Sequence, residues 1–206
     1  HKKANFAKES GFFNEEIVTI NNSKEDIIED GCIRSSTTLE SMSKLSPVLG
    51  ANTSITAATA SPLTDGASFM IVCSENFAIR NNLTPIARIV SGAVTGCDPE
   101  IMGIGPVEAS RMALKRAKWS IEDIDIFELN EAFSSQSIAV INELGINIDK
   151  VNIDGGSLAI GHPLGASGIR IIGKAASILN RTNGERAIAS MCIGGGMGIA
   201  ITLEKP

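Results

Sequence analysis

Aromatic residues are scarce in this 206-residue chain, which has no Tyr, one Trp and an aromatic content of only 4%. Its apolar core must therefore come mainly from Ile, Leu, Val and Ala, which belong to the 43% of hydrophobic residues. Charged residues make up 20%, an ordinary share for a globular protein with a real core. At roughly 100–200 residues per domain, the length indicates one large domain, or one domain and part of another.

Histidine is also rare, since His1 and His162 are the only two, and this excludes a His-rich metal site. The four cysteines form no CxxC pair and no zinc spacing, so no metal site is predicted. In a chain of this length we expect them to be reduced thiols in a reducing compartment.

The sequence lacks the signals that are typical of several function classes. The net charge of −5 gives no general attraction to nucleic acid or to an anionic membrane, and no apolar run could span a bilayer. The glycines form no dinucleotide loop, P-loop or nucleophile elbow. No signal peptide is recognisable, and the opening HKKANFAKES reads as a helix interior without an initiator Met, so we expect an incomplete gene product.

A regular alternation of strands and helices begins at Pro85. The order β-α-β-α-β-α-β-β predicts an α/β fold with a mostly parallel sheet and helices on its faces. Strand patterns occur at 86–94, 124–129, 151–153, 185–193 and 198–204, and helix patterns at 106–118, 132–144 and 165–181.

The preceding part of the chain is less regular. Its patterns predict helices at 1–10, 35–45 and 75–82, and strands at 15–20 and 67–75.

Asn130 stands where a predicted strand gives way to a helix, and ligands collect at the carboxyl ends of strands in α/β folds. Its amide could position a water or donate to an oxyanion. The alternative is a helix N-cap, a role that Asn serves well.

His162 lies between Gly161 and Pro163, in a turn that leads into a helix. Glycines allow close backbone approach, and a helix start favours anionic oxygens. His162 could be a general base or an oxyanion donor, and the alternative is a loop histidine among ordinary turn glycines.

Cys192 ends a predicted strand and precedes three glycines. It could act as a base or nucleophile if nearby donors or a positive group lowered its pKa from about 8.5. The alternative is a buried cysteine before a β-turn. The other cysteines have no catalytic context.

Taken together and in this order, NEAF, GGSLAIGHPLGASG and CIGGGMGIA resemble the thiolase family. The similarity extends through TTLESMSKLSPV, ASPLTDGAS and MGIGPVEASRMALKRA. The resemblance implies one complete βαβαβαββ half of a thiolase fold, with a mixed, mostly parallel sheet and helices on both faces. Residues 1–63 would be the rear of the loop domain, 64–84 the last strand and helix of the N-terminal half, and 85–206 the C-terminal domain.

The family's reaction is a reversible Claisen condensation between acyl-CoA thioesters, with coenzyme A as substrate or product rather than as a cofactor. A first-half cysteine takes the acyl group. By motif match, His162 would activate that thiol and help polarise a thioester carbonyl. Asn130 would hold a water beside His162 and complete an oxyanion hole. Cys192 would move the α-proton, and the N–H of Gly194 would serve the second oxyanion hole.

The same resemblance assigns substrate and CoA contacts to Arg34, Ser41, Ser61, Ala132 and Phe133. A guanidinium such as that of Arg34 suits phosphates or stacking on adenine, although a solvated surface charge is the alternative.

Two departures limit what the resemblance implies. Pro62 resembles members that act on longer chains, whereas CIGGGMG resembles acetoacetyl-CoA thiolases, so the acyl chain length stays open. The nucleophile's cysteine–small–small–glycine setting occurs nowhere in the chain.

The implied partners are acyl-CoA thioesters and the missing N-terminal half, in a homodimer or tetramer without nucleic acid or membrane. The implied location is the cytoplasm, or mitochondria or peroxisomes in a eukaryote. A non-catalytic thiolase-like remnant that binds CoA or a partner is the alternative. A ketoacyl synthase relative is a third candidate, against which Cys192 argues.

Overall fold

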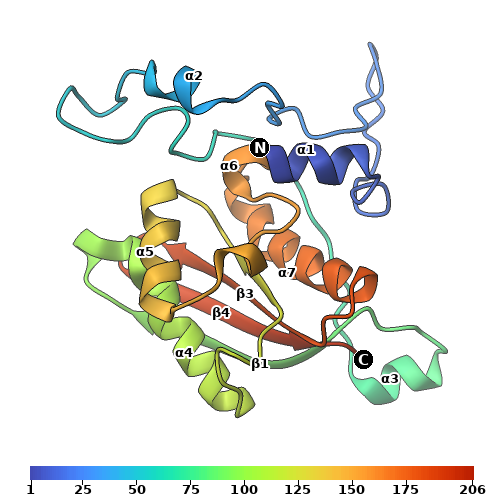
Figure 1. Cartoon of the computed structure of the whole chain (residues 1–206). Helices are drawn as coiled ribbons and strands as arrows, with labels where there is room; N and C mark the ends of the chain where they lie inside the picture. Colours follow the sequence, from blue (N-terminus) through green and yellow to red (C-terminus); the bar gives the residue numbers. More distant parts are fainter.

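The computed structural model describes residues 1–206 and contains one four-stranded sheet (Figure 1). The strands β1 (Arg88–Gly96), β2 (Ile126–Leu129), β3 (Arg186–Ile193) and β4 (Met197–Glu204) lie in the order β1-β4-β3-β2. The mixed α/β sheet is confirmed. The expectation of mostly parallel pairing is wrong, because β4 returns antiparallel between β1 and β3 and only β2 and β3 are parallel.

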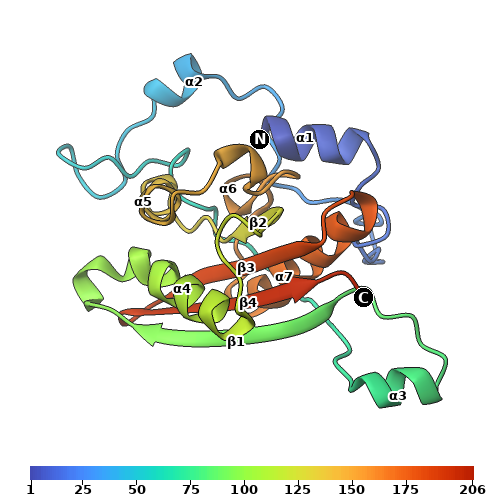
Figure 2. The ribbon, with the colours of Figure 1, turned by 60° about the horizontal axis from the view of Figure 1, so that its bottom comes forward.

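Helices cover both faces of the sheet, as expected (Figure 2). Helices α4 (Gly105–Ala117) and α5 (Ser134–Leu144) pack on one face, and α7 (Leu164–Arg181) packs on the other. Successive residues of a strand point to opposite faces, so Ile126 of β2 joins the α7 core while Phe127 joins the α4 core. The central strands are therefore buried on both sides.

The start of α4 lies directly against β4. Pro106 occupies the first turn, where its missing N–H costs no hydrogen bond. A Cβ added to Gly198 of β4 would overlap the backbone of Gly105, so only glycine allows this approach.

The N-terminal segment packs on the layer that contains α7. Helix α1 (Lys2–Glu9) buries Ala4 and Ala7 against α6 (Ser157–Ile160). The Nζ of Lys3 donates to the carbonyl oxygen of Val151 at 2.9 Å. The short α6 and the N-terminal helix thus share one small apolar core.

Ion pairs fix this segment further. Lys174 of α7, whose side chain is only 2% exposed, lies 2.6 Å from Glu16 and 3.4 Å from Asp154. Arg181 reaches the other oxygen of Asp154 at 2.7 Å. Because a buried charge without a partner is costly, these carboxylates are required for the burial of Lys174.

The remaining helices are short, and none of the helices combines the length and apolar character needed to cross a bilayer. They are α2 (Leu39–Ser43), α3 (Glu75–Arg80) and the 3-10 helices η1 (Pro99–Ile104) and η2 (Ile148–Lys150).

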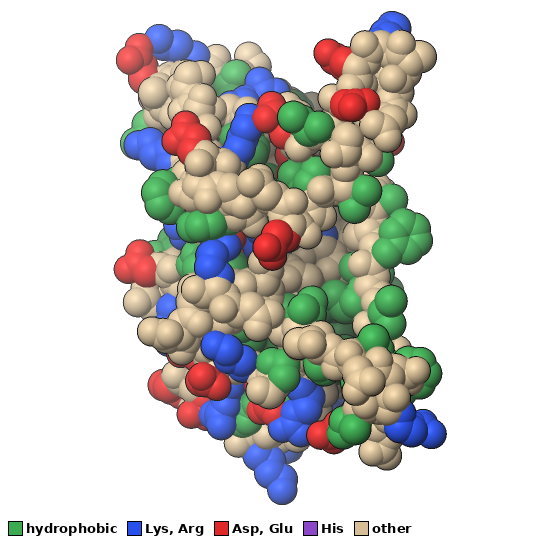
Figure 3. Space-filling model, turned by 90° about the vertical axis from the view of Figure 1, so that its right-hand side faces the viewer, with side chains coloured by type: hydrophobic (Ala, Val, Ile, Leu, Met, Phe, Trp, Pro, Cys, Tyr) green, Lys and Arg blue, Asp and Glu red, His purple; other side chains and the backbone are tan.

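The strand expected at 67–75 does not form. Residues 64–73 are extended but make no backbone–backbone hydrogen bond, and Phe69 and Ile71 are 94% and 88% exposed. A β-strand exists only through hydrogen bonds to a neighbouring strand, and no other strand of this chain lies beside the segment. Hydrophobic side chains gather along the right-hand edge of the face seen in Figure 3.

Two other expected strands are reduced to single bridges. The strand at 151–153 consists of one parallel bridge between Val151 and Phe127. Asn152 has a φ of 45°, and its side-chain amide takes over the pairing by bonding both the N–H and the C=O of Leu129. The strand at 15–20 has one bridge, between Ile20 and Ile27, in a segment without further partners.

Candidate active site

Asn130 and His162 meet at the carboxyl end of β2. Asn130 follows the strand, is fully buried, and its backbone N–H donates to the carbonyl of Ser190 on β3 at 2.9 Å. His162 comes from the turn between α6 and α7. The Nδ2 of Asn130 lies 3.3 Å from the Nε2 of His162. Phe133, not Asn130, occupies the N-cap of α5, so the capping alternative for Asn130 is excluded.

The imidazole is also held from its other side. Its Nδ1 lies 2.7 Å from the Oγ of Ser167, which donates to the carbonyl of Pro163 at 3.0 Å. Burial lowers the pKa of His162, and the positive charge of Arg170 lowers it further. The ring is therefore neutral near pH 7 and can accept a proton.

The turn around His162 is closely packed. Gly161 has a φ of 97°, and a Cβ added there would lie 2.6 Å from the side chain of Thr64. A Cβ on Gly66 would lie 2.7 Å from Pro163. Glycine therefore allows the extended segment around Thr64 to run directly beside the histidine.

Three residues that sequence reasoning missed support this pair. Besides Ser167, Ser157 donates from its Oγ to the Oδ1 of Asn130 at 2.6 Å, and Arg170 donates to Ser157 at 2.9 Å. Their position in the sequence could have indicated the two serines, because they stand five residues before and five residues after His162 in one motif.

Glu128 was also missed, although it is the only charged residue of the four-residue strand β2. It is 1% exposed, and neither carboxylate oxygen has a hydrogen-bond partner. Burial raises the pKa of Glu128 to about 8, against the opposing effect of the nearby positive charges of Arg170 and Lys174.

Cys192 lies on β3, opposite Gly198 of β4, and is partly buried. The parallel register of β2 and β3 places it two residues beyond Ser190, at the same edge of the sheet as Asn130. Burial raises the pKa of Cys192, a backbone hydrogen bond opposes this, and neighbouring Cys97 adds to the rise. The condition of a lowered pKa is therefore not met, and Cys192 is a neutral thiol near pH 7.

Gly194 opens the turn between β3 and β4 and is exposed. A Cβ added there would meet no atom within 4 Å, so the space beside its backbone is open. The next two residues, Gly195 and Gly196, have φ of 91° and 89°, which L-residues with side chains rarely adopt.

Three of the predicted CoA contacts lie together. The N–H of Ser61 donates to the carbonyl of Ala132 at 3.0 Å, and Ala60 forms an isolated bridge with Phe133. Segments that are far apart in the sequence thus lie side by side, next to Asn130.

Arg34 and Ser41 are not joined to that group by any hydrogen bond or ion pair. Both are exposed on the N-terminal segment. The hydroxyl of Ser41 caps α2 in a reciprocal pair with Thr38, accepting from its N–H at 3.0 Å. The guanidinium of Arg34 makes no ion pair within the chain.

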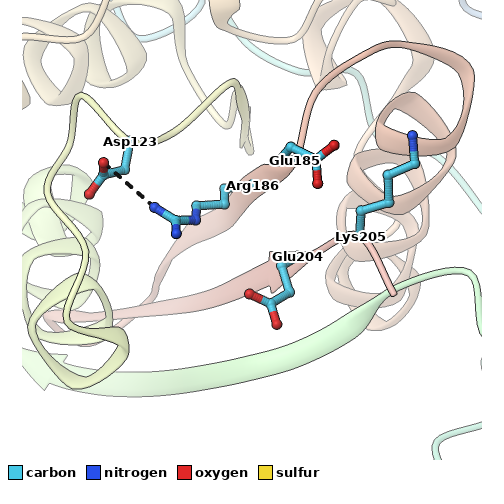
Figure 4. A pocket seen from close by; sticks show the side chains of 5 residues that line it. All are labelled: Asp123, Glu185, Arg186, Glu204 and Lys205. Atoms are coloured by element: carbon cyan, nitrogen blue, oxygen red, sulfur yellow. Dashed lines mark ion pairs between the residues drawn. The ribbon is translucent and has the colours of Figure 1, made fainter.

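A charged cavity of about 360 Å³ lies at the amino end of β3, away from Asn130 and His162 (Figure 4). Arg186 lies 3.5 Å from Asp123 and stacks over the ring of Trp119. This cavity contains no histidine or cysteine and is separate from the site at Asn130 and His162. It is lined by Asp123, Glu185, Arg186, Glu204 and Lys205.

The chain is similar in sequence to a known protein family. Residues 83–205 match the C-terminal domain of thiolase, and residues 1–76 match the N-terminal domain. An acetyl-CoA acetyltransferase of Paracoccus denitrificans is 46% identical over 99% of the chain and 53% of its own length. The mitochondrial 3-ketoacyl-CoA thiolase of Homo sapiens is 45% identical over 97% of the chain and 51% of its own length.

Solved structures give the same result. The Bacillus anthracis acetyl-CoA acetyltransferase superposes with a TM-score of 0.95 at 41% identity, over 100% of this chain and 53% of that one. The human mitochondrial 3-ketoacyl-CoA thiolase in complex with CoA gives 0.93 at 41% identity, over 100% and 52%. The chain spans about half the length of these relatives. On its sequence and its fold, the chain belongs to the thiolase family.

Proposed function

We propose that the chain supplies the acid–base and oxyanion groups for reversible Claisen condensation and thiolysis of acyl-CoA thioesters. The observation that carries the proposal is the 3.3 Å contact between Asn130 and His162 at the carboxyl end of β2, inside the ordered thiolase motifs. The two side chains combine a neutral base with an amide N–H donor, which are the groups that activate a thiol and stabilise an oxyanion.

In the condensation direction His162 takes the proton of a cysteine thiol, and the thiolate attacks the thioester carbonyl. The bond to CoA then breaks, and the departing CoA thiolate regains the proton from His162. The neutral state of the ring suits it to this step, because burial and Arg170 both lower its pKa. The resulting covalent acyl-enzyme divides one difficult transfer into two easier ones. Asn130, buried and fixed, offers its amide to the reacting oxygen or to a water bound beside it.

Cys192 moves the α-proton of the second acyl group. A thiol with a raised pKa can protonate an enolate during thiolysis, and its thiolate is a stronger base for the reverse step. The open space beside Gly194 leaves room for a thioester oxygen near the backbone N–H.

The proposed enzyme needs the N-terminal thiolase half, which carries the acyl-accepting cysteine in the family. An exposed apolar stretch supports this requirement. Leu63, Phe69, Ile71 and Val72 are between 70% and 103% exposed, and their segment has no strand partner. Several large apolar side chains exposed on one segment are typical of an interaction site.

The proposed substrates are acetyl-CoA and acetoacetyl-CoA, or longer 3-ketoacyl-CoA thioesters. A relative named acetyl-CoA acetyltransferase supports the short substrates, and a relative named 3-ketoacyl-CoA thiolase supports the longer ones. We further propose that the complete protein is a homo-oligomer with a role in fatty acid metabolism. We also propose a cytoplasmic or organellar location, since the relatives include cytosolic and mitochondrial proteins.

The test is to co-express this chain with the N-terminal half of the Paracoccus denitrificans relative and to measure cleavage of acetoacetyl-CoA by CoA. We expect cleavage only in the mixture, and its loss in His162→Ala and Cys192→Ser. Cys32→Ser is the matched control, because Cys32 is a free thiol outside the catalytic groups and outside the exposed apolar stretch. Rates with longer 3-ketoacyl-CoA thioesters then give the chain-length preference.

A co-purified complex without any cleavage would refute the proposed activity. It would favour the alternative, a thiolase-like chain that binds CoA or a partner without catalysis. Retention of full cleavage in Cys192→Ser would instead remove Cys192 from the mechanism.

A further inference from the structure

A line of hydrogen bonds reaches His162 from the interior of the protein. The Nη2 of Arg170 on α7 donates to the Oγ of Ser157 at 2.9 Å, and Ser157 donates to the Oδ1 of Asn130 at 2.6 Å. The Nδ2 of Asn130 then lies 3.3 Å from the Nε2 of His162. The line begins at a guanidinium, which can only donate.

The same line continues beyond the imidazole. The Nδ1 of His162 lies 2.7 Å from the Oγ of Ser167, and this hydroxyl lies 3.0 Å from the carbonyl oxygen of Pro163. The line ends at a carbonyl, which can only accept. One end therefore supplies protons and the other end receives them.

These two ends fix the direction of every link between them. With Asn130 Oδ1 toward Ser157, each serine donates its single proton along the line and His162 carries its proton on Nδ1. With the amide reversed, Nε2 must carry the proton and Ser167 must donate to Nδ1. Ser167 then has no proton for Pro163, and the hydroxyl proton of Ser157 has no partner.

We infer that Ser157, held by Arg170, is a positioning residue that sets the orientation of the Asn130 amide and thereby the tautomer of His162. The inference deepens the proposed role of His162 as a base. In the fixed tautomer Nε2 is the unprotonated nitrogen, on the side of Asn130, and is ready to take a proton. The reversed amide would present a protonated Nε2, which cannot act as a base.

The surroundings of Arg170 support its proposed role in holding Ser157. Its Nε and Nη1 are buried without hydrogen-bond partners, so the bond to Ser157 is the only one that its guanidinium makes. Ser157 is itself 0% exposed, which keeps water from replacing either of its bonds. A buried network in which each hydroxyl and imidazole proton has one acceptor specifies one arrangement more strongly than a solvated network does.

The experiment reads the tautomer directly. His162 is the only histidine besides His1, so a long-range proton–nitrogen NMR spectrum of the histidine-labelled chain shows two imidazoles, and His1→Gln assigns them. We expect Nδ1 protonated and Nε2 bare. In Ser157→Ala, the loss of one buried hydrogen bond should reduce the ratio of the two tautomers about tenfold.

Ser110→Ala is the matched control, because Ser110 is equally buried but lies on α4, in the other helical layer. Its tautomer ratio should equal that of the unmodified chain. An unmodified chain protonated on Nε2, or an unchanged ratio in a folded Ser157→Ala chain, would overturn the inference. The measurement needs neither substrate nor turnover, so failure of acetoacetyl-CoA cleavage leaves it unaffected.

Discussion

The buried carboxyl of Glu128 makes the stability of the chain depend on pH in a direction opposite to that of most carboxylates. Burial raises its pKa from 4.5 to about 8. Between these values the folded chain keeps a proton that the unfolded chain releases. The free energy of unfolding therefore falls by about 1.4 kcal/mol for each pH unit as pH rises through this range.

Glu128→Gln replaces the carboxyl by a neutral group of the same shape and removes this dependence. Integration of the linkage between pH 5 and pH 8 gives a relative stabilisation of the variant of about 3–4 kcal/mol. Urea denaturation of both chains at the two pH values measures it. Comparing two pH values cancels any constant packing effect of the amide.

Glu122→Gln is the control, since Glu122 lies exposed on the surface, and its unfolding free energy should follow that of the unmodified chain. If the difference between Glu128→Gln and the unmodified chain is the same at pH 5 and pH 8, the carboxyl is already ionised in the fold. In that case the reasoning from burial is refuted.

Three further outcomes are expected. Lys174→Met should destabilise the chain by about 3–5 kcal/mol in urea, because it leaves the buried carboxylate of Asp154 without one of its partners; an unchanged midpoint would contradict the ion-pair assignment. Gly198→Ala should cost about 3 kcal/mol or more in the same assay, since the methyl group overlaps the first residue of α4. At pH 7.5 iodoacetamide should modify Cys192 several-fold more slowly than exposed Cys73, as followed by mass spectrometry, and equal rates would speak against the raised pKa.

Most elements after Pro85 could be predicted from sequence because their signals are local. The β-branched run of β1, the early proline of α4 and the glycine after α5 each act within a few residues. The sheet order could not be read in this way, since the return of β4 between β1 and β3 depends on contacts between distant segments.

The strand expected at 67–75 shows the limit of a composition-based prediction. Its apolar residues fit a strand, but the pattern does not say which strand would pair with it. Asn152 shows a different limit. Hydrophobicity predicts that strand pairing continues at 151–153, but the side-chain amide of Asn152, instead of its backbone, bonds Leu129 and ends the pairing.

The candidate site was predictable where it carries a motif. Asn130 and His162 were identified as candidates from sequence and lie together in the structure. The serines that hold these two side chains were not identified from sequence. Serine is common, and the roles of Ser157 and Ser167 depend on a turn that brings them to opposite sides of the Asn130–His162 pair. The pKa of Cys192 likewise depends on burial, which its neighbours in sequence do not reveal.

The unpaired stretch at 64–73 has a consequence for handling the protein. Its backbone N–H and C=O groups are open, and its side chains are β-branched or aromatic at several positions, as in segments that stack into fibrils. Chains produced alone and concentrated would add to one another along this stretch. The yield of soluble chain should therefore rise when a complementary polypeptide is made in the same cell.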